Sequence, residues 1–253
     1  MPRFAANLTM LFTELPLQQR FAAAAAAGFE GAEILFPYDI AVSDLSRAAI
    51  RAGLKIVLIN CPPPNWAGGP RGFAAQPGME DRFRHDFVRA LRVAESLRAR
   101  HIHIMAGKAE GARADAAFLD NLAWAAARAP HASLTIEPIN HEDMPGYYLS
   151  DYDKAAAIIE RLGATNLGLQ FDAYHAQKIT GDALAAWAPV ASLVRHVQIA
   201  GCPGRHEPDT GGIDYPAFFE MLDRSGYRGW VSAEYDPVRQ TAAGLGWLPA
   251  RTP

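Results

Sequence analysis

The chain has 253 residues, of which half are hydrophobic and a fifth are charged. This composition is ordinary for a globular protein with a sizeable core. The formal net charge of −3 gives no electrostatic reason to expect nucleic acid or an anionic membrane as a partner. The two cysteines, Cys61 and Cys202, lie far apart in the sequence. This usage is typical of a reducing compartment and argues against a disulfide scaffold or a thiolate metal site.

The amino-terminal segment does not predict an export signal or a membrane span. Asn7, Thr9 and Glu14 fall where a signal peptide would need an unbroken apolar core. The alanine run over residues 22–27 is too short to cross a bilayer and predicts a helix instead. We therefore expect a cytoplasmic protein.

Short apolar segments alternate along the chain with longer helical segments. The starts of the apolar segments are about 25–45 residues apart, which is the length of one strand–helix unit. The eight predicted strands begin at Phe4, Gly31, Lys55, His101, Ser133, Leu167, Val194 and Trp230.

Three of the intervening segments carry clear helix boundaries. A helix is predicted from Ser43 as N-cap to Gly53, a second from Ser150 to Gly163, and a third from Pro216 in the first turn to Gly226.

Eight strand–helix units without a break in composition predict an α/β fold, a single (β/α)8 TIM barrel that forms one domain over residues 1–253. A doubly wound open sheet is the alternative. No G-x-G-x-x-G or P-loop motif follows any predicted strand, so nothing supports a nucleotide site.

The segment after the third predicted strand is too rich in proline and glycine to form a helix. It runs over residues 62–70 and, with Trp66 and Arg71, is a candidate lid over the mouth of the barrel. A plain surface connection explains it equally well.

Polar residues stand at or near the carboxyl ends of four predicted strands, where the active site of such a barrel lies. An ionised carboxylate among apolar strand residues is costly unless something compensates it. The four residues are Glu137, Asp172, Gln198 and Glu234.

These four residues are separated in turn by 35, 26 and 36 positions, which are consecutive strand–helix periods. Their side chains should therefore lie on adjacent strands at similar height. Converging carboxylates repel each other unless a cation lies between them, and an all-oxygen set suits Mg²⁺ or Mn²⁺ better than Zn²⁺. Any one of them alone would read equally well as a structural carboxylate, but together they predict a divalent metal site.

Several cationic and imidazole groups follow the same strand ends. His175, Arg205, His206 and Lys108 are candidates for binding a substrate oxygen or carboxylate. For Lys108 a solvated loop position is nearly as good an interpretation, and for His206 the two interpretations are equal.

Other titratable residues alternate with apolar residues inside predicted strands. We interpret His101 and His196 as structural, and we place His103 in the interior of the barrel. Glu33 is an interior carboxylate that we expect to orient the site rather than to react.

The motifs TIEPIN, QFDAYHAQ, HVQIAG, GRHEPDTGGIDY and the late EY resemble the hydroxypyruvate isomerase family of the xylose isomerase-like barrels. FAANLTMLF, ILFPYD and NWAGGPRG are also similar to that family, so the resemblance runs nearly from end to end. The set is specific, although EPIN or DxYH alone would be weak.

The resemblance implies interconversion of hydroxypyruvate and 2-hydroxy-3-oxopropanoate (tartronate semialdehyde). It implies that Glu137 and Glu234 donate and accept the proton and also bind the metal, with Asp172 and Gln198 completing the metal set. The expected chemistry is metal-assisted proton transfer through an enediolate, without an organic cofactor. The expected partner is a small hydroxy-carbonyl acid, and a homo-oligomer is one of the assemblies that the sequence allows.

Other activities of the same superfamily are alternatives that the sequence supports to different degrees. Ketose 3-epimerases typically carry His where this chain has Gln198, which counts against them. The 2-oxo-tetronate isomerases share nearly all the motifs, including the Gln. Apurinic endonucleases of this fold use a larger His-rich zinc cluster and a basic face, which the charge and residues here disfavour. A non-catalytic sugar-acid binding protein would not need carboxylates on successive strands.

Overall fold

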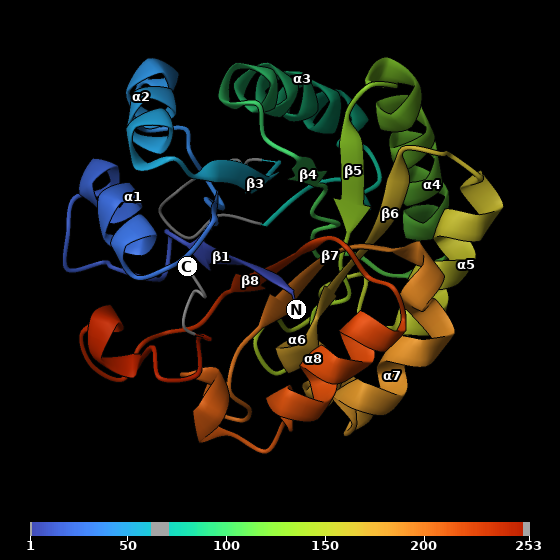
Figure 1. Ribbon diagram of the computed structural model, residues 1–253. Coiled ribbons are helices and arrows are strands. Elements are labelled where there is room, and N and C mark those ends of the chain that lie inside the picture. Colours follow the sequence, from blue (N-terminus) through green and yellow to red (C-terminus); the bar gives the residue numbers. More distant parts are fainter. Residues whose placement is uncertain (1, 62–70, 250–253) are drawn as a thin grey trace.

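In the computed structural model, which describes residues 2–61 and 71–249, eight parallel strands close into a barrel (Figure 1). Strand β1 pairs with both β2 and β8, so the open-sheet alternative is wrong and the (β/α)8 prediction is confirmed. The strands are β1 (Arg3–Asn7), β2 (Gly31–Glu33), β3 (Lys55–Asn60), β4 (His101–His103), β5 (Ser133–Ile136), β6 (Leu167–Asp172), β7 (Val194–Ile199) and β8 (Trp230–Ala233).

The helices form a ring around the barrel, as Figure 1 shows. They are α1 (Leu17–Ala26), α2 (Val42–Ala52), α3 (Glu80–Leu97), α4 (Gly111–Arg128), α5 (Tyr152–Leu162), α6 (Ala173–Thr180), α7 (Ala183–Val190) and α8 (Tyr215–Arg224). Short 3₁₀ turns lie at Ala191–Leu193, Pro208–Thr210 and Thr241–Gly244. The alanine run is helical, as predicted, and no helix of the described chain is long and apolar enough to cross a membrane.

The predicted helix boundaries are confirmed in part. In α8, Pro216 lies in the first turn as predicted, but the C-cap is Ser225, one residue before the predicted Gly226. Gly53 and Gly163 adopt left-handed C-cap conformations, because glycine has no side chain that would clash there. Ser43 and Ser150 are not the N-caps. The N-cap of α2 is Ala41, two residues earlier, and it makes no side-chain hydrogen bond. Helix α5 is capped by Asp151, whose carboxylate accepts a hydrogen bond from the backbone N–H of Lys154 at 2.7 Å.

Alternate residues of each strand face opposite sides of the barrel wall. On β6, Leu169 and Phe171 belong to the apolar core between strands and helices, whereas Gln170 and Asp172 are buried polar residues in the barrel interior. The interior is thus largely polar at its carboxyl end, and the helices supply the apolar packing that holds it closed.

The predicted lid, residues 62–70 with Trp66, lies outside the described residues. The chain is described again from Arg71, and Gly72 forms an isolated bridge with Ala106 after β4. A side chain at position 72 would meet the carbonyl oxygen of Met105 at 2.2 Å, so this approach of two loops requires glycine.

Substitution of Phe171 tests how much the apolar packing between strands and helices contributes to the free energy of unfolding. Its ring contacts Tyr152, Trp187 and Phe218 and is fully buried. We expect Phe171→Ala to lower the free energy of unfolding by about 3–5 kcal/mol, and Phe171→Leu to cost clearly less, because leucine leaves a smaller cavity. Denaturant titration followed by circular dichroism measures both, and equal losses would contradict the packing argument.

Candidate active site

A cavity of about 620 Å³ opens at the carboxyl ends of the strands. Its lining combines residues that the sequence singled out with apolar and amide side chains from the neighbouring loops. Its polar lining residues include Asn60, His103, Lys108, Glu137, Asp143, Gln170, His175, Gln198, Arg205 and Glu234.

The four predicted residues lie at or near the carboxyl ends of four adjacent strands, but Glu137 is level with Gln170 instead of Asp172. Asp172 pairs in register with Gln198, and Glu234 directly follows β8 one step beyond the pair of Ile199 with Ala233. Glu137 directly follows β5 and is level with Gln170, because Ile136 pairs with Leu169. The stagger of the barrel therefore brings Gln170 between Glu137 and Gln198.

Two glutamine side chains connect the carboxylates into one buried network. The Gln170 amide donates to Glu137 Oε2 at 3.0 Å and to Gln198 Oε1 at 2.7 Å. The Gln198 amide in turn donates to Glu33 and to Glu234. These contacts fix the orientation of both amides, since a flipped Gln198 would place its oxygen against two carboxylates.

Arg205 supplies the positive charge that lies among the carboxylates. It stands in the loop after β7, where its backbone carbonyl accepts from Asp236 N–H at 2.9 Å. Its Nη2 donates to Glu234 Oε1 at 2.8 Å and lies 3.4 Å from Asp172 Oδ2, and Nη1 is 3.8 Å from Asp143 Oδ2. The prediction made Arg205 a substrate-binding group, whereas the structure shows it bridging Asp172 and Glu234.

His175 is oriented by Asn140. The Asn140 side-chain oxygen accepts from Asp143 N–H at 2.9 Å, which turns its amide nitrogen to within 2.7 Å of His175 Nδ1. Burial lowers the pKa of His175 well below its usual value, so the ring is neutral. Because Nδ1 is the acceptor, the proton is on Nε2, which faces Asp172 Oδ2 at 3.6 Å and Glu137 Oε1 at 4.0 Å.

The charges of this site do not balance. Burial, reinforced by neighbouring carboxylates, raises the pKa of Glu137 well above its ordinary value. Burial also raises the pKa of Asp172 to about 7, although Arg205 opposes it, and that of Glu234 to about 8, with the Glu33 charge adding to the rise. For Arg205, burial alone would lower the pKa, but the carboxylates outweigh it and raise it.

The donor set fits a cation. Ligand atoms of Glu137, Asp172 and His175 lie within 4.8 Å of one another, and all three residues are buried. With His175 Nε2 protonated, the oxygen atoms of the set are the ligands that remain, and these suit a hard divalent ion. Gln198 Oε1 accepts one hydrogen bond and keeps a second lone pair that could face a metal.

The remaining predicted residues divide between the cavity and its surroundings. Lys108 lines the cavity with its side chain exposed. His206 does not line the described cavity: its ring is exposed and Nδ1 bonds the Asp236 carbonyl at 2.8 Å. His103 lies inside, with Nδ1 3.2 Å from Asn60 Oδ1 and 3.5 Å from Glu137 Oε2.

Sequence reasoning missed Gln170 and Asn140 as parts of the site. Gln170 could have been found, because it is two residues before Asp172 on the same strand and therefore shares its face. Asn140 lies inside the quoted TIEPIN motif, but its contact with His175 depends on how two loops meet. Glu33 was expected to orient the site, and it does receive hydrogen bonds from Asn7, Gln198 and His196.

Comparisons with known proteins agree with this geometry. The sequence profile described as "Xylose isomerase-like TIM barrel" matches residues 21–251. The chain belongs to the xylose isomerase-like TIM barrel family. It is 48% identical over 254 residues to the 2-oxo-tetronate isomerase of Cupriavidus necator and 39% identical to the hydroxypyruvate isomerase of Escherichia coli, with 98% of each chain covered in both cases. These relatives confirm the prediction of an isomerase of this superfamily.

Two solved structures resemble this chain, one in sequence and fold and the other in fold alone. The structure described as an AP endonuclease, family 2, from Brucella melitensis is 42% identical with a TM-score of 0.94, covering 98% of each chain. A D-allulose 3-epimerase from Methylomonas sp. has a TM-score of 0.74 and covers 92% of this chain and 84% of its own. At 17% identity, that second likeness shows the shared fold alone.

The raised pKa values predict an unusual pH dependence of stability. In the metal-free protein, Asp172 and Glu234 hold protons in the folded state up to about pH 7 and 8, whereas in the unfolded chain they lose them near their ordinary values of 3.8 and 4.5. The folded state binds more protons in this window, so stability is present at low pH and is lost as the pH rises. Each such group contributes roughly 1 kcal/mol per pH unit.

Thermal unfolding of chelator-treated protein between pH 5.5 and 8 measures this effect, and we expect the melting temperature to fall across the range. Asp172→Asn is the matched control, because Asn keeps an oxygen that can cap α6 but does not titrate, and it should flatten the slope. A metal-free wild type that gains stability toward pH 8 would contradict the interpretation.

Proposed function

We propose that the chain interconverts hydroxypyruvate and 2-hydroxy-3-oxopropanoate by moving a proton between neighbouring carbons. The observation that carries this proposal is the cluster of buried carboxylates at a cavity of about 620 Å³: the Arg205 guanidinium bridges Asp172 and Glu234, and Glu137 lies beside Asp172 and His175. The pKa of Asp172 is raised to about 7 and that of Glu234 to about 8, and carboxyl groups in this range can both accept and return a proton at physiological pH.

The residues differ in how freely they can exchange that proton. Both oxygens of Glu234 are engaged, one by Arg205 and one by Gln198. Glu137 receives Gln170 on Oε2 only, and its Oε1 faces the cavity near the His175 N–H. Glu137 is therefore the better placed to take the first proton, while the His175 N–H donates to a substrate oxygen.

Metal assistance is part of the proposal. Glu137, Asp172 and Glu234, with the Gln198 amide oxygen, would hold a Mg²⁺ or Mn²⁺ ion, which would supply the positive charge that stabilises an enediolate. Proton exchange at Glu137 and Glu234 needs no organic cofactor.

A second candidate is isomerisation of a 2-oxo-tetronate, which is one carbon longer. It is favoured by the 48% identity to the Cupriavidus necator enzyme, compared with 39% for the Escherichia coli hydroxypyruvate isomerase. Both substrates are short hydroxy-carbonyl acids that undergo the same proton shift, so the residues above serve either one. Gln198 still counts against a ketose epimerase.

The direct test is an assay of both acids and a panel of neutral ketoses, with metal-free protein before and after addition of Mg²⁺ or Mn²⁺. We expect turnover of at least one acid, dependence on the added metal, and no turnover of the ketoses. The ratio of kcat/KM for the two acids decides between the two candidates. Full activity in protein shown by elemental analysis to be metal-free would contradict metal assistance, and turnover of ketoses alone would contradict the proposal.

The paired glutamates give the sharpest mutational test. Glu137→Gln and Glu234→Gln keep the size and an oxygen ligand but remove the base, so each should lower kcat by about 10²–10⁴. In the double variant the losses should not add, because a two-base relay stops when either member is missing. Recovery of one variant at high metal concentration, with extensive direct transfer of the substrate hydrogen to product, would show that a single glutamate is catalytic.

Lys108 and His206 both follow strand ends, but only Lys108 lines the described cavity, so the pair tests which of them binds the substrate. Lys108 lines the cavity, so we expect Lys108→Ala to raise KM for an anionic substrate several-fold, with kcat nearly unchanged, because a charge-assisted hydrogen bond is lost. His206 lies outside that lining, and His206→Ala should stay near wild type. Steady-state kinetics that reverse this order would restore His206 as the substrate contact.

A further inference from the structure

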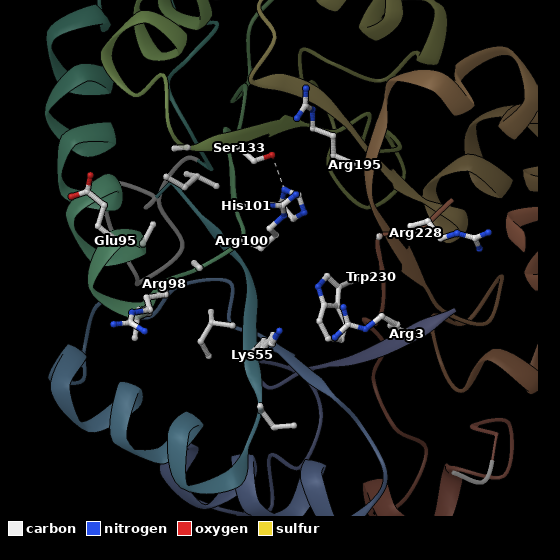
Figure 2. A pocket seen from close by; sticks show the side chains of 18 of the residues that line it. Arg3, Lys55, Glu95, Arg98, Arg100, His101, Ser133, Arg195, Arg228 and Trp230 are labelled. Carbon is white, nitrogen blue, oxygen red and sulfur yellow. Dashed lines mark hydrogen bonds between the residues drawn. The ribbon is translucent and has the colours of Figure 1, made fainter. Parts of the chain in front are cut away.

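A second and larger cavity, of about 1260 Å³, lies where the strands begin. Figure 2 shows the side chains of 18 of the residues that line it. Four of its cations come from strand starts: Arg3 opens β1, Lys55 opens β3, Arg100 directly precedes β4, and Arg195 is the second residue of β7. The register of a closed barrel therefore gathers them around one mouth.

Positive charge is concentrated there although the chain as a whole has a net charge of −3. Arg98 and Arg228 extend the set at the rim. Glu95 is the one acidic residue among the described residues of the lining, and it is engaged by His131 at 2.9 Å.

Helix carboxyl ends also lie on this side of the barrel, and their dipoles favour cations. That explanation predicts hydrogen bonds from the cations to backbone carbonyls. Arg195 does donate to the Thr165 carbonyl at 2.6 Å. Within residues 2–61 and 71–249, however, Lys55 and Arg100 have neither a side-chain hydrogen bond nor an ion pair, so capping does not account for them.

The inner end of the cavity offers neutral polar groups and an aromatic face. His101 is 3% exposed, and its Nδ1 lies 2.9 Å from the hydroxyl oxygen of Ser133 (Figure 2). Burial lowers the pKa of His101 well below its usual value, with His196 and the nearby arginines adding to the effect, so the ring adds no further positive charge. Arg3 stacks on Trp230 at 3.9 Å, which holds one guanidinium in place, and its Nε lies 3.7 Å from Glu30 Oε2, so this cation already has one carboxylate partner.

We propose that this cavity binds a small-molecule anion that carries two or more phosphate or carboxylate groups. Such a ligand relieves the mutual repulsion of the clustered cations, and arginine side chains match either group with paired hydrogen bonds. The described linings of the two cavities share no residue, so this site is distinct from the one under the carboxyl ends of the strands.

Isothermal titration calorimetry with tripolyphosphate and with citrate, at a constant ionic strength near 0.15 M, tests the proposal. We expect saturable binding of one anion per chain, and the stronger of the two probes identifies the preferred class. Lys55→Gln/Arg100→Gln should weaken binding at least about tenfold, because two charged partners are lost. Lys55→Gln alone, at an exposed side chain, provides a milder variant that should also bind less tightly.

Arg51→Gln/Arg92→Gln is the matched control, because it removes the same charge from exposed helical positions outside this cavity and should bind within about twofold of wild type. Equal weakening in the control would show non-specific attraction and overturn the proposal. So would loss of binding in Lys108→Gln, which would place the anion at the other mouth. Absence of saturable binding by either probe, or binding of a duplex oligonucleotide instead, would also overturn it.

Discussion

The properties of the site follow from one constraint: several buried carboxylates share fewer cations than they need to stay ionised. Glu33, Glu137, Asp172 and Glu234 are all nearly or fully inaccessible, and Arg205 is the guanidinium that reaches two of them. An ionised carboxylate in such surroundings is stable only with a partner or a bound ion, and otherwise it takes up a proton. This lack of compensating positive charge raises the pKa values of Glu33, Asp172 and Glu234 toward neutrality. Groups with such pKa values are also what proton transfer between carbons requires.

The barrel keeps this arrangement in place because the two faces of each strand have different roles: the outer face packs against the helices and the inner face carries the polar groups. On β6, Phe171 packs outward among aromatic rings while Gln170 and Asp172 face the interior. The glutamine amides then fix the carboxylates with respect to one another. Asp172 also caps α6 by accepting from Tyr174 N–H at 2.8 Å, which leaves one carboxylate oxygen directed at the site. A rigid site of this kind loses little freedom when a ligand or substrate binds.

Periodicity and spacing predicted the closed barrel, the start of each strand to within a residue, and the four residues at the strand ends. These follow from local sequence. Alternation along a strand fixes which residues face the interior, and in a barrel of this kind the active site lies at the carboxyl ends of the strands. The sequence could not predict that Arg205 would bridge Asp172 and Glu234, or that Asn140 would set the tautomer of His175. Both contacts are made by loops whose conformation depends on non-local partners, such as the hydrogen bond from Asp236 N–H to the Arg205 carbonyl. The offset of Glu137 likewise comes from the barrel stagger and not from spacing along the chain.

Proton release on metal binding tests the central claim most directly. If the carboxylates hold protons because Arg205 alone does not compensate their charges, Mn²⁺ must displace those protons when it binds. Calorimetric titration of chelator-treated protein with Mn²⁺ at pH 6.5, repeated in buffers of different ionisation enthalpy, gives the number of protons released. We expect roughly one or more protons per Mn²⁺ in the wild type, and fewer with weaker binding in Asp172→Asn. Binding without proton release, or no binding at all, would contradict the view that these carboxylates form a cation site.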